Sequence, residues 1–178
     1  AIFPVHEPVC KMIENGTITS IEGSTNGPVG RLISEGKMHG LAVMRSHGGR
    51  VRAIMAGHIK IDAAFIAAPC ADEYGNANGR SGPAACGPMG YAMADSKYAR
   101  NVILVTDNLQ PYPVLPPVIN QADTDYVVKV DSIGNPQEIA SGTTEVATDA
   151  QSLKIARNAA DLVDKLGLVK DGMGFQAG

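Results

Sequence analysis

Residues 62–90, DAAFIAAPCADEYGNANGRSGPAACGPMG, join an apolar run to a long glycine-rich loop. The run at 63–67 is continuously apolar, which is typical of a β-strand that is buried on both faces. The following segment, 69–90, holds five glycines and two asparagines. These residues adopt backbone dihedrals that others resist, so the segment is predicted to be a shaped loop. Such long loops in compact domains are either functional or disordered.

Short strands and helices alternate on both sides of this segment. Short strands are predicted at 18–21, 41–44, 63–67, 102–105 and 126–130, of which 63–67 is a continuous apolar run. Apolar residues at helical spacing predict helices at 8–15, 28–36, 47–56, 91–99 and 148–167. This alternation predicts an α/β fold in which a mostly parallel sheet is flanked by helices on both faces, a three-layer α/β/α arrangement.

Local signals add detail to these elements. Ser46 is predicted to cap the helix at 47–56, with Val51, Ile54 and Met55 turned inward. Thr148 and Gln151 match a capping box at the start of the last helix. The proline-rich segment PYPVLPPV, 111–118, is predicted to run extended over the surface.

Composition indicates an ordinary globular protein. The 178 residues are 44% hydrophobic and 19% charged, which fits one domain, or one domain and a fragment of a second. The net charge of −3 provides no positive electrostatic potential that would attract nucleic acid or an anionic membrane. No apolar run approaches the roughly 20 residues of a membrane span, and no signal peptide is visible. Three cysteines, an odd number, suggest reduced thiols in a cytoplasmic protein.

Several polar segments directly follow predicted strands. They are the glycine-rich loop, the turn SHGGR at 46–50, Asp107–Asn108 and Asp131–Ser132. In open α/β sheets, ligands bind beyond the carboxyl ends of the strands. We therefore expect these segments to converge on a binding surface.

The turn Ser46-His47-Gly48-Gly49-Arg50 is the best local anion site. Its two glycines let a ligand approach the N–H groups at a helix N-terminus. The Arg50 guanidinium can bind a carboxylate or phosphate through two parallel hydrogen bonds. A tight strand–helix turn with Ser46 as a plain cap is an equally open reading.

Other chemistry has weaker support. Cys70 and Cys86 with His47 lack the close spacing of metal ligands, and Cys86 is predicted to be a small packing residue. Adjacent acids such as Asp72 and Glu73 usually face water or cap a turn. The phosphate-binding pattern G-x-x-x-x-G-K-[ST] and the dinucleotide-binding pattern G-x-G-x-x-G are both absent. The residues alone thus indicate a ligand-binding α/β domain without a complete catalytic constellation.

A family resemblance extends over almost the whole chain. It is carried by FPVHEPV, SHGGRVRAI, DAAFIAAPCADEYGNANG, GPAACGPMGYAM, VTDNLQPYP, DYVVKVDSIGNP and DGMGFQAG. Together these segments closely resemble the citrate lyase alpha subunit family, the citrate transferase branch of the coenzyme A transferases. The resemblance implies that 1–168 form most of a first coenzyme A transferase-like domain, without its first strand. Residues 169–178 would begin a second domain.

The resemblance also implies an activity. Such subunits move the thioester of an acyl carrier protein from acetate to citrate, so the substrate is an acyl thioester of a coenzyme A-like group, and no tightly bound cofactor or metal is expected. The nucleophilic glutamate is expected in the second domain, so no catalytic residue is assigned in this chain. The implied partners are a beta subunit, an acyl carrier (gamma) subunit, citrate, acetate and acyl-coenzyme A, in a cytoplasmic oligomer without nucleic acid or membrane.

On this reading the chain shapes the acyl site. The expected substrate-binding residues lie in the SHGGR turn and the glycine-rich loop: Ser46, His47, Gly48, Gly49, Arg50, Asn76, Asn78, Gly79 and Gly87. Backbone N–H groups and side-chain amides there could bind carboxylates or the thioester oxyanion. The alternative is a non-catalytic small-anion-binding or assembly module on the same fold.

Overall fold

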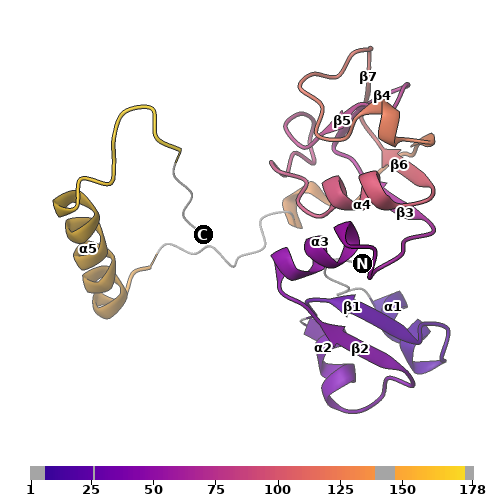
Figure 1. Ribbon diagram of the computed structural model, residues 1–178, viewed down its shortest axis with the longest axis horizontal. Coiled ribbons are helices and arrows are strands. Elements are labelled where there is room, and N and C mark those ends of the chain that lie inside the picture. Colours follow the sequence, from indigo (N-terminus) through magenta and orange to yellow (C-terminus); the bar gives the residue numbers. More distant parts are fainter. Residues whose placement is uncertain (1–6, 26, 139–146, 175–178) are drawn as a thin grey trace. The chain divides into compact units, whose positions relative to one another are not determined.

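The computed structural model describes residues 7–25, 27–138 and 147–174, shown as a ribbon in Figure 1. The chain divides into two compact units, residues 1–136 and 137–178. Every helix in the described ranges is too short or too polar to cross a membrane. The last four residues of the terminal DGMGFQAG segment, 175–178, lie outside the described residues.

The first unit alternates helices and strands as the sequence predicts. Its helices are α1 (Glu7–Glu14), α2 (Gly27–Ser34), α3 (His47–Met55) and α4 (Ala92–Tyr98), with a short 3-10 helix at Gln121–Asp123. A second 3-10 helix, Pro136–Glu138, begins at the last residue of this unit. Its strands are β1 (Ser20–Gly23), β2 (Leu41–Met44), β3 (Ala64–Ala67), β4 (Cys70–Asp72), β5 (Ala77–Asn78), β6 (Val102–Thr106), β7 (Leu109–Gln110) and β8 (Tyr126–Lys129).

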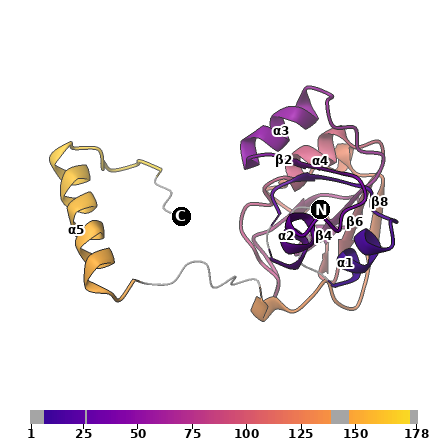
Figure 2. The ribbon, with the colours of Figure 1, turned by 90° about the horizontal axis from the view of Figure 1, so that it is seen from below.

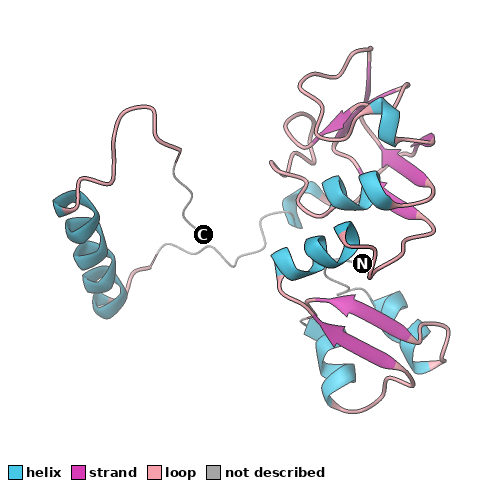
Figure 3. Ribbon diagram, viewed as in Figure 1, coloured by secondary structure: helices cyan, strands magenta, loops and turns pink. Residues whose placement is uncertain are grey.

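The five predicted strands correspond to β1, β2, β3, β6 and β8, and all pairs among them are parallel. The predicted α/β class with parallel strands and flanking helices is therefore confirmed. Figure 3 shows the strands in separate groups: β1 pairs with β2, and β3, β6 and β8 form a second sheet in the order β3-β6-β8. A third sheet, β5-β4-β7, was not predicted, because its strands have only two or three residues.

The core of the first unit lies on one face of the β3-β6-β8 sheet. Ile66, Val102 and Leu104 are buried there, together with Ile119 from the segment before β8. Figure 2 shows α3 and α4 next to each other, and α3 buries Ile54 as predicted. Met55 was wrongly predicted to face inward, since its side chain is exposed.

The second unit contains one long helix, α5 (Ala150–Lys165). Its cap is Asp149, whose carboxylate accepts a hydrogen bond of 2.8 Å from the Ser152 N–H. The predicted capping box of Thr148 and Gln151 is therefore wrong by one residue, because a carboxylate in this position caps a helix as well as a hydroxyl. Gly167 ends the helix with a positive φ of 61°, as predicted.

Candidate functional site at the start of α3

Ser46 caps α3 as the sequence predicts. The Gly49 N–H donates a hydrogen bond of 3.1 Å to the Ser46 Oγ. A Cβ at Gly49 would lie 2.8 Å from that oxygen, so a larger residue there would require the Ser46 side chain to shift. At Gly48, by contrast, an added Cβ would meet no atom within 4 Å. Gly48 therefore presents the open side of the helix N-terminus, where the helix dipole favours anions.

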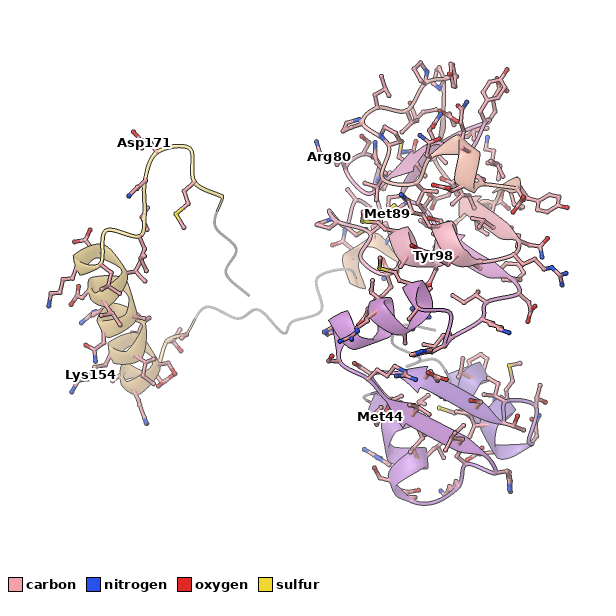
Figure 4. All side chains as sticks on the ribbon, in the orientation of Figure 1. Met44, Arg80, Met89, Tyr98, Lys154 and Asp171 are labelled. Atoms are coloured by element: carbon pink, nitrogen blue, oxygen red, sulfur yellow. The ribbon has the colours of Figure 1, made fainter. Side chains whose placement is uncertain are left out.

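The end of the glycine-rich loop lies against this turn. A groove of about 490 Å³ is lined by His47, Gly48 and Val51 from α3, and by the residues that lead into α4: Pro88, Met89, Gly90 and Tyr91. Met89, labelled in Figure 4, lies in this loop just before α4. The structure thus brings together two segments that the sequence singled out, and gives their common surface an apolar lining.

Arg50 occupies a different position from the one predicted. Its side chain is buried, with only 7% of the residue exposed, and its Nη1 donates a hydrogen bond of 3.0 Å to the Asp95 Oδ1. The guanidinium also lies 5.3 Å from the centre of the Tyr91 ring. The charge of Arg50 thus pairs with a buried carboxylate and joins α3 to α4, while its buried Nε has no hydrogen-bond partner among the described residues.

Tyr91 links this ion pair to the groove. Its ring stacks on His47, with the ring centres 5.4 Å apart. Its hydroxyl is buried and has no hydrogen-bond partner in the described part of the chain. Since a buried hydroxyl without a partner is costly, Tyr91 marks a place where a further polar group can be accommodated.

The first half of the glycine-rich loop is held by Asp72, which is fully buried. Its two carboxylate oxygens accept hydrogen bonds from the N–H groups of Tyr74, Asn76 and Val114 and from the Asn76 amide. Burial alone raises the pKa of Asp72, but these hydrogen bonds outweigh it and hold the pKa below its usual value. Asp72 is thus a structural carboxylate that caps the turn after it, and Glu73 is exposed, so each acid takes one of the two roles that the sequence suggested.

The two predicted asparagine ligands point into the protein. Asn76 is buried, and its amide donates to Asp72 and Gln121 while accepting from the Gln121 N–H. Asn78 is also buried; it donates to the Pro116 carbonyl and accepts from the Arg80 N–H. Both amides shape the loop, so the structure does not support a direct role for Asn76 in holding a substrate carboxylate.

Asn78 borders a separate pocket of about 440 Å³. The pocket lies between the glycine-rich loop and the proline-rich segment, and Ser81, Gly82 and Asn108 are among its other lining residues. The proline-rich segment is not simply an extended surface segment as predicted. It buries Val114, whose N–H binds Asp72.

Gly79 and Gly87 close the second half of the loop. The Gly79 carbonyl accepts hydrogen bonds of 2.9 Å from the N–H groups of both Cys86 and Gly87. A Cβ at Gly79 would collide with the Gly87 carbonyl oxygen. Gly79 is therefore required by the loop itself. Cys86 is exposed, contrary to its predicted packing role.

Tyr91 and Asp95 are the important residues that sequence reasoning missed. Asp95 had a detectable signal, since a carboxylate among small apolar residues of a helix suggests a buried partner. The described residues contain no cluster of three or more His, Cys, Asp or Glu side chains that could bind a metal. All three cysteines are free, and burial raises the pKa of the Cys70 thiol, with a smaller contribution from the Asp72 charge.

The whole chain is similar to one family of proteins. The family model described as citrate lyase, alpha subunit (CitF) matches residues 1–178. The citrate lyase alpha chain of Klebsiella pneumoniae is 41% identical over 179 residues, covering 100% of this chain and 35% of the relative. That of Escherichia coli (strain K12) is 41% identical over 174 residues, or 97% of this chain and 34% of the relative.

A solved structure is also similar. The crystal structure of an alpha subunit of citrate lyase from Streptococcus mutans, in complex with citrate, superimposes with a TM-score of 0.86 at 48% identity. The match covers 99% of this chain and 35% of that protein. The chain therefore spans about a third of the length of the relatives that it matches.

Proposed function

This chain belongs to the citrate lyase alpha subunit family, and we propose that it is the part of a citrate–acyl-carrier-protein transferase that forms one wall of the substrate site. The reaction exchanges the acetyl group on a carrier thioester for citrate and releases acetate. The carboxylate nucleophile is contributed from outside residues 1–178. The observation that carries the proposal is the groove in which the open N-terminus of α3 meets residues 88–91.

The chemistry of this groove suits an acyl thioester with an anionic acyl group. Gly48 lies in the first turn of α3 and lines the groove, with open space where a side chain would stand, and the helix dipole favours a carboxylate or an oxyanion at this end of the helix. The apolar lining from Val51, Pro88 and Met89 can cover the aliphatic part of a pantetheine-like arm.

A relative supports the assignment of the ligand. The Streptococcus mutans protein was solved in complex with citrate, and we propose that citrate binds beside Gly48 and His47 in this protein as well. The further partners are a beta subunit and an acyl carrier subunit of a cytoplasmic citrate lyase complex. The substrates are acyl-thioesters, and no tightly bound cofactor takes part.

Gly48→Val tests the groove without disturbing the fold. An added side chain at Gly48 meets no atom within 4 Å, and valine is a better helix former than glycine. We expect the variant of the full-length protein to keep its thermal stability but to lose transfer activity at least tenfold, about 1.4 kcal/mol of transition-state stabilisation. The measurement is the rate of acetate release from the acetylated carrier in the presence of citrate.

Gly30→Ala in α2 is the matched control, because it adds a Cβ to another helical glycine with only ordinary contacts, the nearest at 3.5 Å. It should leave the transfer rate unchanged. A Gly48→Val protein that is folded and fully active would show that substrate does not bind in this groove. A full-length protein that binds citrate but transfers no acyl group would favour the alternative, a non-catalytic anion-binding module.

A further inference from the structure

Tyr91 connects the buried layer between α3 and α4 to the groove. It directly precedes α4 and is only 8% exposed, yet it lines the groove together with His47 and Gly48. Its carbonyl accepts hydrogen bonds of 2.9 and 2.8 Å from the N–H groups of Ala94 and Asp95, which fix its main chain at the start of the helix. The contacts of the ring therefore decide where the side chain lies.

Two side chains of α3 contact this ring. The His47 imidazole stacks on it, with an angle of 27° between the two planes, and the Arg50 guanidinium carbon lies over it. Residues three positions apart share one face of a helix, so both contacts come from the same side of α3. The ring thus has an aromatic contact at the groove, where His47 is exposed, and a cation–π contact in the buried layer.

Arg50 is itself fixed by two further contacts. It pairs with Asp95 of α4, and only 9% and 12% of the two side chains are exposed. A Cβ at Gly23, the last residue of β1, would lie 3.4 Å from the Arg50 Cδ, so the stem of the arginine passes along the end of this strand. Close packing of this kind leaves a side chain one conformation. Arg50 therefore gives the Tyr91 ring a fixed support.

The Tyr91 hydroxyl takes no part in this arrangement. It is buried and has no hydrogen-bond partner among the residues that the structure describes. A buried hydroxyl without a partner costs stability, so it does not hold the side chain in place. The contacts that hold Tyr91 run through the aromatic ring.

We propose that Tyr91 is a positioning residue of the transferase, whose ring, supported by Arg50, keeps the His47 imidazole oriented for citrate. This inference rests on the proposed function, in which citrate binds beside Gly48 and His47. An exposed histidine side chain loses rotational freedom when it binds a ligand. Stacking on a fixed ring removes that freedom before citrate arrives, which lowers the entropic cost of binding.

The role predicts an effect on one substrate only. The arm of the carrier is assigned to the apolar lining of Val51, Pro88 and Met89, which a substitution of Tyr91 leaves in place. Loss of the stack should weaken the binding of citrate and leave the affinity for the acetylated carrier as it is. A residue that only stabilised the fold would affect both substrates.

Tyr91→Leu in the full-length protein removes the ring but keeps an apolar side chain. We expect the KM for citrate to rise about three- to tenfold, which corresponds to the strength of one aromatic pair. The kcat and the KM for the acetylated carrier should stay within about twofold of wild type. Tyr91→Phe, the conservative variant, should restore the KM for citrate because it keeps the ring.

Tyr98→Leu is the matched control. It is the same substitution in the same helix, and Tyr98, labelled in Figure 4, is 47% exposed and does not line the groove. Its three kinetic constants should equal those of wild type.

NMR of the histidine rings tests the stack without measuring activity. In full-length protein with labelled histidine, the ring protons of His47 should resonate upfield of those of the exposed His58 at the same pH, because His47 lies against an aromatic face. The upfield shift should persist in Tyr91→Phe. Addition of citrate should move the His47 resonances and leave those of His58 in place; His47→Gln identifies the signals.

Three results would overturn the proposal. They are an unchanged KM for citrate in a folded Tyr91→Leu protein, equal losses for both substrates, and a Tyr91→Phe protein as impaired as Tyr91→Leu, which would mean that the hydroxyl binds the substrate. If Tyr91→Leu does not fold, the NMR experiment decides, and His47 signals at the positions of His58 contradict the stack. A stacked His47 that does not respond to citrate would instead contradict the proposed function.

Discussion

Replacing Asp72 with asparagine is expected to lower the free energy of unfolding of the first unit by about 3 kcal/mol. The carboxylate accepts four hydrogen bonds in a fully buried position. An asparagine amide keeps the shape but turns an N–H₂ group toward two donors, among them the Val114 N–H. Urea unfolding of the chain near pH 7, followed by circular dichroism, measures the loss.

The pH dependence of this variant gives a second readout. The pKa of Asp72 is lowered in the folded protein, so its ionised form contributes stability that is fully present above the unfolded value of about 3.9. That contribution is lost as the pH falls through the lower folded pKa. The difference in stability between wild type and Asp72→Asn should therefore be constant near neutral pH and shrink below about pH 3.9.

Asp131→Asn is the control for this experiment. Asp131 is an exposed aspartate of the same unit, so its substitution should leave the unfolding midpoint unchanged. If Asp72→Asn were as stable as Asp131→Asn at neutral pH, the network around Asp72 would not hold the loop together.

Breaking the buried ion pair between Arg50 and Asp95 is expected to have a similarly large effect. Arg50→Met leaves the Asp95 carboxylate buried without its partner, which typically costs about 3–5 kcal/mol. Asp95→Leu leaves the guanidinium unpaired beneath Tyr91, with a comparable loss. Both are measured as shifts of the unfolding midpoint.

The double variant Arg50→Met, Asp95→Leu distinguishes the stability that comes from the ion pair from the stability that each side chain contributes through its own contacts. Because neither charge remains, we expect it to recover most of the stability that each single variant loses, which appears as a large coupling in the double-mutant cycle. Additive losses would mean that the two side chains stabilise α3 and α4 independently. In that case Arg50 would again be a candidate for binding an anionic ligand.

The sequence predicts the framework of this protein well because strands such as β3 and β6 are largely apolar runs and its helices carry clear start and stop signals. β3 and β6 each differ by one residue from the predicted bounds, and Ser46 caps α3 as expected. Such signals are local, so they can be read without knowing which residues meet in space.

The site was harder to predict because its important contacts are long-range. Asp72 meets Val114 across 42 positions, and Arg50 meets Asp95 across 45. Nothing in the segment around Asn76 distinguishes an amide that binds a ligand from one that bonds to Gln121 in the fold. The glycines were equally ambiguous: Gly48 faces open space, whereas Gly79 is required by a neighbouring carbonyl group.

The central claim is that the start of α3 and residues 88–91 form the citrate-binding wall of the transferase. A crystal structure of the full-length protein with citrate tests it most directly. Our account predicts a citrate carboxylate about 3 Å from the Gly48 amide nitrogen, beside the stacked rings of His47 and Tyr91. Citrate bound with no atom near the first turn of α3 or residues 88–91 would contradict it.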